Sequence, residues 1–179
     1  MGLDTVSKFF FEYLSPYAYG WGNETLEFIV ASQLIEKGLT LSVSESCSGG
    51  LISKRLTDVA GSSSFFLGGI IAYSNDIKEN QLSISKELLK KDGAVSQSVA
   101  EAMARSIQTI TKSDIAIATT GISGPSGGTD KKSVGLVYIA ISYNGNVWVK
   151  EFNFFPKRLL HREITSQTAL NMVRKIINE

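Results

Sequence analysis

The apolar positions of this chain follow two rhythms, one typical of amphipathic helices and one typical of buried strands. The helical rhythm predicts long helices over residues 23–37, 96–111 and 157–178. Asn23 and Ser96 are the expected caps of the first two, and Gly38 is expected to stop the first. Shorter helices are predicted over residues 49–56, 76–81 and 86–91.

The second rhythm predicts strands over residues 39–45, 66–73, 114–120, 135–143 and 147–155. The last two flank Asn144-Gly145, which is typical of a hairpin turn. Strands alternate with helices up to this hairpin, which indicates an α/β fold class. We expect a three-layer α/β/α sandwich with a mixed sheet and a C-terminal β-hairpin followed by a helix.

The first 22 residues differ in texture from the rest, because aromatic residues cluster there around a proline and two glycines. Such side chains need a surface to cover them. We interpret residues 1–22 as an arm or linker that packs on the domain, on a neighbouring domain or on a second subunit. Residues 23–179 are then the folded domain, and the arm favours a homodimer.

Charge and composition exclude several classes of protein. The 179 residues carry 18 Lys and Arg against 17 Asp and Glu, so there is no electrostatic basis for a nucleic-acid or membrane-surface binder. The uncharged stretches 59–75 and 133–149 are too short and too rich in Gly, Ser and Asn to span a bilayer. No basic segment precedes an apolar run at the N-terminus, which favours a cytoplasmic protein.

A single cysteine, Cys47, and a single histidine, His161, narrow the chemistry further. They allow neither an intrachain disulfide nor a Cys/His structural zinc site, and a reducing compartment is expected. His161 lies among basic residues of the last helix, where we interpret it as a solvent-exposed histidine. Cys47 is either a small buried residue or a nucleophile.

Two glycine-rich segments follow predicted strands, residues 46–50 and 121–128. In sheets of this class, ligands collect at the carboxyl ends of the strands, so an active site is expected between these segments. Ser46 is either a helix cap, together with Ser48, or a nucleophile approached closely by substrate because Gly49 and Gly50 follow it.

A serine nucleophile needs a base, and a lysine of lowered pKa can serve. Lys78 follows the strand that ends near Tyr73, at the same end of the sheet as Ser46. Tyr73 would relay a proton or orient the amine. The alternatives are a lysine on a helix surface and a half-buried strand tyrosine.

The second segment resembles an anion-binding loop, although it has neither the Walker nor the dinucleotide spacing. Its candidate substrate-binding residues are Thr120, Gly121, Ser123, Gly124, Gly127 and Gly128. A flexible turn is the alternative. Arg158 and Arg162 are four residues apart on the last helix, where they form either a phosphate clamp or a solvated basic face.

Several segments occur in an order that resembles one family: 44–50 (SESCSGG), 58–63 (DVAGSS), 73–75 (YSN), 93–96 (GAVS) and 120–128 (TGISGPSGG). Together they resemble the CinA C-terminal domain family, known from competence/damage-inducible proteins, whose stand-alone relatives include nicotinamide-nucleotide amidases of the PncC type. The resemblance covers the chain from about Asn23 to its C-terminus.

The resemblance implies hydrolysis of the carboxamide of nicotinamide mononucleotide to nicotinate mononucleotide and ammonia, in pyridine-nucleotide salvage. It places the family's serine, tyrosine and lysine on Ser46, Tyr73 and Lys78. N–H groups near Ser48 and Gly49 would hold the oxyanion. The glycine loop, with Arg158 or Arg162, would hold the phosphate. Neither a metal nor an organic cofactor is implied.

The chain departs from the family pattern at three places. Ser48 replaces a threonine, and residues 132–136 read KSVGL instead of KPVGT, which bears on substrate fit. Residues 17–26 resemble the junction that joins this domain to a molybdopterin-binding-like domain in full-length relatives. Two other functions stay open: a catalytically silent nucleotide-binding or dimerisation module, and a serine–lysine amidase for another amide.

Overall fold

A computed structural model of the chain describes residues 14, 18–20 and 22–178. In this part of the chain, five strands form one sheet in the order β2-β1-β3-β4-β5. Their bounds are β1 Leu41–Glu45, β2 Phe66–Ile71, β3 Ile115–Gly121, β4 Leu136–Tyr143 and β5 Asn146–Asn153. β1 pairs in parallel with β2 and β3, and β4 pairs antiparallel with β3 and β5. The mixed sheet and the closing hairpin are therefore confirmed.

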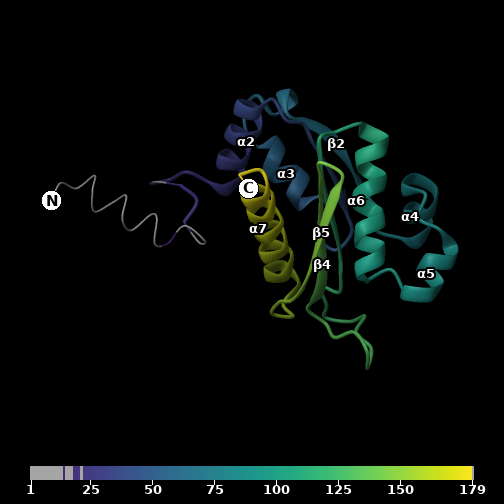
Figure 1. Cartoon of the computed structure of the whole chain (residues 1–179). Coiled ribbons are helices and arrows are strands. Elements are labelled where there is room, and N and C mark those ends of the chain that lie inside the picture. Colours follow the sequence, from purple (N-terminus) through teal and green to yellow (C-terminus); the bar gives the residue numbers. More distant parts are fainter. Residues whose placement is uncertain (1–13, 15–17, 21, 179) are drawn as a thin grey trace.

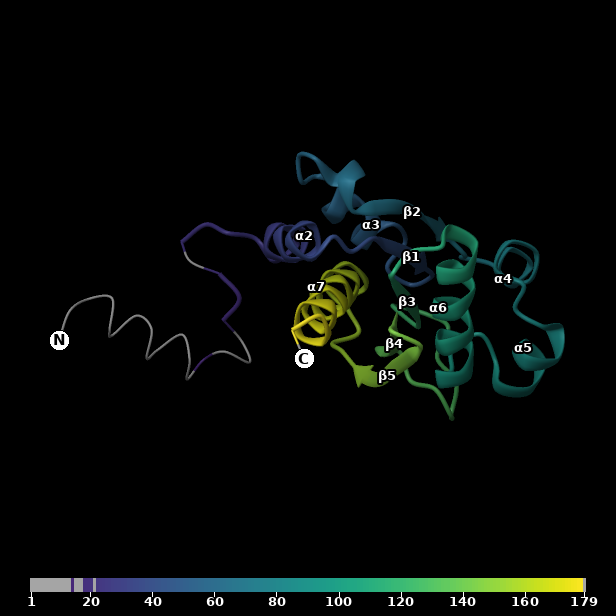
Figure 2. The ribbon, with the colours of Figure 1, turned by 45° about the horizontal axis from the view of Figure 1, so that its top comes forward.

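Helices cover both faces of this sheet (Figures 1 and 2). One face carries α2 Leu26–Lys37, α3 Leu51–Thr57 and α7 Arg158–Ile176. The other face carries α6 Gln97–Thr111, and α4 Asn75–Leu82 and α5 Lys86–Asp92 lie beside α6. A short 3₁₀ turn, Ser62–Ser64, precedes β2. This arrangement confirms the three-layer α/β/α sandwich.

The central strand β3 shows how alternation builds the two cores. Ile115 and Ile117 pack into the core beneath α2, α3 and α7, whereas Ala116 and Ala118 pack against α6. The small alanines allow α6 to lie close to the sheet. The middle strands are therefore packed between helices on both faces. The loops at the ends of these strands are held in place by this packing.

The ends of the elements differ from expectation in a few places. Thr25 caps α2 in place of Asn23, because its hydroxyl accepts the Phe28 N–H. Ser96 caps α6 as expected. The arm predicted over residues 1–22 lies mostly outside the described residues; within it, Tyr19 packs against the core under α2 and α7. The division into arm and domain stays a prediction.

The topology brings four chain segments to one edge of the sheet. β1, β2 and β3 are parallel, so the residues that follow Glu45, Ile71 and Gly121 share that edge. β5 runs in the direction of β3, so α7 also begins there, at Arg158. Among the described residues, no helix combines the length and apolar character needed to cross a membrane.

Candidate active site

A cavity of about 250 Å³ opens at this shared edge. Residues from all four segments line it, together with two residues of the segment before α6: Ser46, Cys47, Tyr73, Asn75, Lys78, Ala94, Val95, Thr120, Gly121, Ile122, Ser123, Gly124, Ser126, Gly127 and Arg158. Ten of the residues that the sequence singled out are in this set, including Cys47, the alternative nucleophile. Sequence reasoning missed Asn75, Ala94, Val95, Ile122 and Ser126, although each lies in or beside a motif of the resemblance.

Ser46 lines this cavity. Its N–H donates to the Thr119 carbonyl at 3.0 Å, which extends the β1–β3 pairing by one residue and fixes the serine backbone. The side chain is 8% exposed, and its Oγ lies 3.1 Å from Nζ of Lys78. The chain then turns through Gly49 and Gly50 with φ of +63° and +91°, a region that favours glycine.

Lys78 reaches Ser46 from α4, whose first turn is capped by the Ser74 side chain. The lysine is 1% exposed, so its interpretation as a helix-surface residue is wrong. Its Nζ donates to the Ala72 carbonyl at 2.6 Å as well as contacting Ser46 Oγ. Burial lowers the pKa of Lys78 below its ordinary value, which favours the neutral amine that a general base requires.

Glu45 fixes the turn that carries Ser46, a role that sequence reasoning missed. Its buried carboxylate accepts the N–H groups of Gly50, Ile52 and Ser53 and the Ser53 hydroxyl, all at the start of α3. The interpretation of Ser46 and Ser48 as helix caps is wrong, because Glu45 satisfies these donors instead. Ser48 Oγ bonds Thr119 Oγ1 at 2.7 Å.

Replacing Glu45 with glutamine is expected to destabilise the fold. The amide offers one oxygen where the carboxylate uses both, so buried N–H donors lose their acceptor. We expect a loss of about 1–3 kcal/mol in the free energy of unfolding, measured by thermal and urea denaturation. Glu27→Gln is the matched control, because the ion pair between Glu27 and Arg55 lies away from this cavity. Equal stability of Glu45→Gln and the parent would contradict this role.

Cys47 is the other nucleophile that the sequence offered. The side chain is buried, and burial raises the pKa of its thiol to about 12. A thiol with this pKa stays protonated and unreactive near neutral pH. The geometry therefore favours Ser46 over Cys47.

Tyr73 and Arg158 meet at the mouth of the cavity. Tyr73 is 58% exposed, and its hydroxyl accepts a hydrogen bond from Arg158 Nη2 at 2.7 Å. Arg158 Nη1 donates to the Gly124 carbonyl at 3.2 Å. The Tyr73 hydroxyl thus pairs with Arg158 and not with the Lys78 amine, so its expected relay of the serine proton has no direct contact in this structure.

The glycine loop forms part of the cavity wall. Of its predicted residues, Gly128 alone does not line the cavity. Thr120 Oγ1 donates to the Ala94 carbonyl at 2.7 Å, and Lys132 Nζ donates to the carbonyls of Asp92 and Val95 at 2.6 Å. These bonds attach the glycine loop and the residues after it to the segment before α6.

The remaining predicted residues do not line the cavity. Ser48, Gly49, Gly50 and Arg162 are outside the lining set. Arg162 donates through Nε to the Ser48 carbonyl at 3.0 Å and through Nη2 to the Gly49 carbonyl at 3.4 Å. Arg162 therefore anchors the Ser46 turn to α7, whereas Arg158 faces the cavity, so the two arginines do not form the expected clamp.

His161 was expected to be exposed, and this expectation is wrong. The side chain is 0% exposed and bonds Ser123 on the glycine loop and the Gly135 carbonyl. Within the described part of the chain, no group of three or more His, Cys, Asp or Glu side chains could hold a metal ion.

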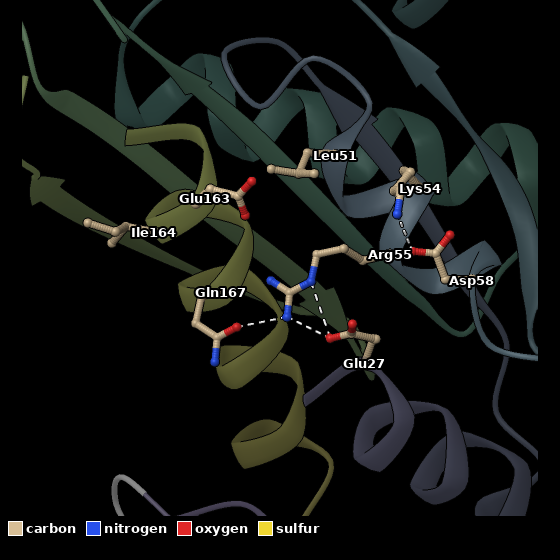
Figure 3. A pocket seen from close by; sticks show the side chains of 8 residues that line it. All are labelled: Glu27, Leu51, Lys54, Arg55, Asp58, Glu163, Ile164 and Gln167. Atoms are coloured by element: carbon tan, nitrogen blue, oxygen red, sulfur yellow. Dashed lines mark hydrogen bonds and ion pairs between the residues drawn. The ribbon is translucent and has the colours of Figure 1, made fainter. Parts of the chain in front are cut away.

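A larger cavity of about 560 Å³ lies between α2, α3 and α7, away from this edge (Figure 3). Its central Arg55 is held by Glu27, Gln167 and Ser166, and Lys54 pairs with Asp58. These charges are paired with one another, and neither a serine–lysine pair nor a glycine-rich loop lines this groove. The smaller cavity is therefore the candidate active site.

Comparison with known proteins agrees with the family resemblance and with the fold. The family model of the CinA C-terminal domain matches residues 23–177. A CinA-like protein of Desulfotalea psychrophila is 44% identical over 164 residues, which are 92% of this chain and 40% of that protein. A CinA-like protein of Geobacter sulfurreducens is 47% identical over 154 residues, 86% of this chain and 37% of that protein.

A solved structure gives the same result. The crystal structure of the competence/damage inducible protein CihA from Agrobacterium tumefaciens matches with a TM-score of 0.83 and 38% identity, over 86% of this chain and 94% of that one. The chain spans about two fifths of the length of the curated relatives it matches. By its sequence and its fold, the chain belongs to the CinA C-terminal domain family.

Proposed function

We propose that this domain hydrolyses the carboxamide of nicotinamide mononucleotide to nicotinate mononucleotide and ammonia. The observation that carries the proposal is the 3.1 Å contact between Ser46 Oγ and the buried Lys78 Nζ inside a polar cavity. A nucleophile and a base within hydrogen-bond distance are what serine-dependent amide hydrolysis requires. Membership of a family whose relatives include nicotinamide-nucleotide amidases supports the choice of substrate.

The contacts of Lys78 favour one direction of proton transfer. A neutral amine has two hydrogens and one lone pair; one hydrogen is held by the Ala72 carbonyl, so the lone pair can face the Ser46 hydroxyl. Lys78 takes the Ser46 proton while Oγ bonds the amide carbon. The C–N bond then breaks, Lys78 returns the proton to the leaving ammonia, and water hydrolyses the acyl-enzyme.

Two N–H groups in the segment expected to hold the oxyanion already donate within the protein. The Gly49 N–H donates to the Ser46 carbonyl at 3.2 Å, and the Gly50 N–H donates to Glu45. Both N–H groups are already used in hydrogen bonds that hold the turn after Ser46. We assign the oxyanion instead to backbone N–H groups of cavity-lining residues beside Ser46 and on the facing loop, namely Cys47 and Ser123.

Arg158 is the residue we assign to the phosphate, because it is the one arginine of the cavity lining. Arg158→Ala is expected to raise KM for nicotinamide mononucleotide by about 10–100-fold, the value of a charge-assisted hydrogen bond. KM for nicotinamide riboside, which has no phosphate, should change little. Steady-state kinetics on both substrates measure this, with Arg105→Ala on the exposed face of α6 as control. Equal losses on both substrates would remove Arg158 from phosphate binding.

The test of the proposed function is ammonia release by the purified chain from nicotinamide mononucleotide and from nicotinamide riboside. Faster release from the mononucleotide supports the proposal. Equal rates would indicate an amidase for other amides, and binding without release would indicate a silent nucleotide-binding module. The homodimer, and a molybdopterin-binding-like domain in longer relatives, stay predictions beside this one.

A further inference from the structure

His161 is the one histidine of the chain, and it is buried between α7 and the segment that joins β3 to β4. Its Nδ1 lies 3.0 Å from Ser123 Oγ, and its Nε2 lies 3.1 Å from the Gly135 carbonyl oxygen. The Phe154 ring meets the imidazole edge-on, with centroids 5.9 Å apart. The ring is thus fixed on both nitrogens and on one face.

These contacts determine which nitrogen carries the proton. A carbonyl oxygen only accepts hydrogen bonds, so Nε2 must be the protonated nitrogen. Burial lowers the pKa of His161, against a weaker opposing effect of the Gly135 carbonyl, so the ring is neutral near neutral pH. Nδ1 then has no hydrogen, and it accepts the hydroxyl hydrogen of Ser123.

The bond to His161 determines what Ser123 can offer a ligand, because Ser123 also lines the candidate active site. A serine hydroxyl has one hydrogen, and His161 holds it. The Cys47 carbonyl, 3.4 Å from Ser123 Oγ, is the competing acceptor. While His161 is neutral, the Ser123 hydroxyl oxygen can therefore accept a hydrogen bond from a group in the cavity but cannot donate one.

We propose that His161 is a positioning residue that makes Ser123 a hydrogen-bond acceptor, and that this acceptor selects a carboxamide over a carboxylate. The inference rests on the proposed function, in which the substrate carries an amide –NH₂ and the product a carboxylate. The amide can donate to Ser123, whereas the carboxylate has no hydrogen to donate and meets lone pairs. The pair thus favours substrate binding and product release.

The polarity of the pair depends on pH in one direction. Below its lowered pKa, His161 becomes protonated, Nδ1 donates to Ser123, and the serine hydrogen is free for Cys47 or the cavity. The cations nearest on α7 are engaged elsewhere: Arg158 bonds Tyr73 and Gly124, and Arg162 bonds the Ser46 turn. From other elements, Phe154 is uncharged and the Cys47 thiol is protonated. Selection for the amide should weaken as pH falls through the pKa of His161.

The first measurement is nitrogen NMR of the parent protein, in which a single histidine gives an unambiguous signal. We expect hydrogen on Nε2 and none on Nδ1 at neutral pH. A proton on Nδ1 under these conditions would overturn the inference without any ligand.

The second measurement is the ratio of the dissociation constants of nicotinate and nicotinamide mononucleotides, by calorimetry in a Ser46→Ala background that prevents turnover. His161→Val and Ser123→Ala should each lower this ratio by about tenfold, the value of one hydrogen bond. The double variant should show no further change, because both residues act through one bond. Thr165→Val, which removes a buried bond to the His161 carbonyl, is the control for loosening α7 and should leave the ratio unchanged.

The outcomes separate this inference from the proposed function. An unchanged ratio in both single variants, with both nucleotides bound, would overturn the role of His161 and leave the proposed function standing. If His161→Val does not fold, Ser123→Ala and the NMR result still decide. Binding of neither nucleotide would overturn the proposed function and, with it, the selection of amide over carboxylate.

Discussion

Ser46→Ala is expected to abolish ammonia release while the protein still folds and binds substrate. The variant removes the atom that we propose forms the covalent bond, and it leaves the backbone bond to Thr119 and the Glu45 cap in place. We expect kcat to fall by about 10⁴-fold or more, as is typical for loss of a serine nucleophile that works with its base as a unit. Steady-state kinetics and calorimetric substrate binding on the same preparation measure both halves of this expectation.

Ser44→Ala is the matched control for this variant. Ser44 is buried two residues earlier in β1, and its hydroxyl donates to the Met103 carbonyl on the α6 side of the sheet. Its removal deletes a hydroxyl of the same strand without touching the cavity, so activity should persist. Near-normal turnover by Ser46→Ala would make the serine mechanism wrong, and Cys47→Ala would be the next variant to examine.

Lys78→Met is expected to remove activity while preserving the fold. Loss of a general base typically costs about 10²–10⁴-fold in rate, and more where base and nucleophile act together. Methionine fills a similar volume without an amine that must be desolvated. Because burial lowers the pKa of Lys78, the folded protein disfavours the ammonium form that the unfolded chain adopts at neutral pH. Removing the amine should therefore raise the free energy of unfolding. The lost hydrogen bond to the Ala72 carbonyl offsets part of this gain, so we expect a value equal to or above that of the parent.

The pH dependence has a definite sign. In the proposed mechanism the active form of Lys78 is the neutral amine, so kcat/KM of the parent should rise with pH through the lowered pKa of Lys78 and fall below it. The stability cost has the matching dependence: it is absent where the amine is neutral in both states and grows as pH falls towards the pKa of the folded state. The gain in stability of Lys78→Met should shrink at high pH.

Lys86→Met provides the control, because Lys86 is an exposed lysine of the neighbouring helix and pairs with Glu79 at 3.6 Å. It should change neither the rate nor its pH profile. A Lys78→Met protein that folds and turns over substrate at the parent rate would contradict the assignment of the base. A large fall in melting temperature would show that Lys78 is needed mainly for the fold.

The position of the site at one edge of the sheet could be predicted from the sequence. Strands and the glycine-rich segments that follow them can be recognised from short stretches of residues. Glycine-rich exits after β1 and β3 and the parallel direction of β1, β2 and β3 place Ser46 and the glycine loop at one edge. The approach of Lys78 to Ser46 follows from the same rule. Its role as the base still awaits the kinetic test.

Side-chain destinations across the fold were harder to predict. Glu45 ends a strand in which every residue is buried. Nothing in the sequence of this strand shows that the Glu45 carboxylate binds N–H groups at the start of α3. His161 lies among charged residues of α7, so its local pattern indicated exposure, yet packing against Phe154 and the Gly135 carbonyl buries it. Both roles depend on contacts between residues far apart in the chain, which a periodicity does not encode.

The proposed nucleophile and the proposed base follow two strands that are not equally well paired. Ser46 follows β1, which is paired on both sides, but Lys78 is carried by the segment after β2, an edge strand that is paired only with β1 and contains Gly68 and Gly69. Glycines weaken a strand, and an edge opens more readily than a centre. Local fraying of β2 would separate the base from the nucleophile while the rest of the sheet stayed intact. Heat should therefore abolish the proposed activity before the domain melts globally, and the loss of that activity would report the opening of one edge of the sheet.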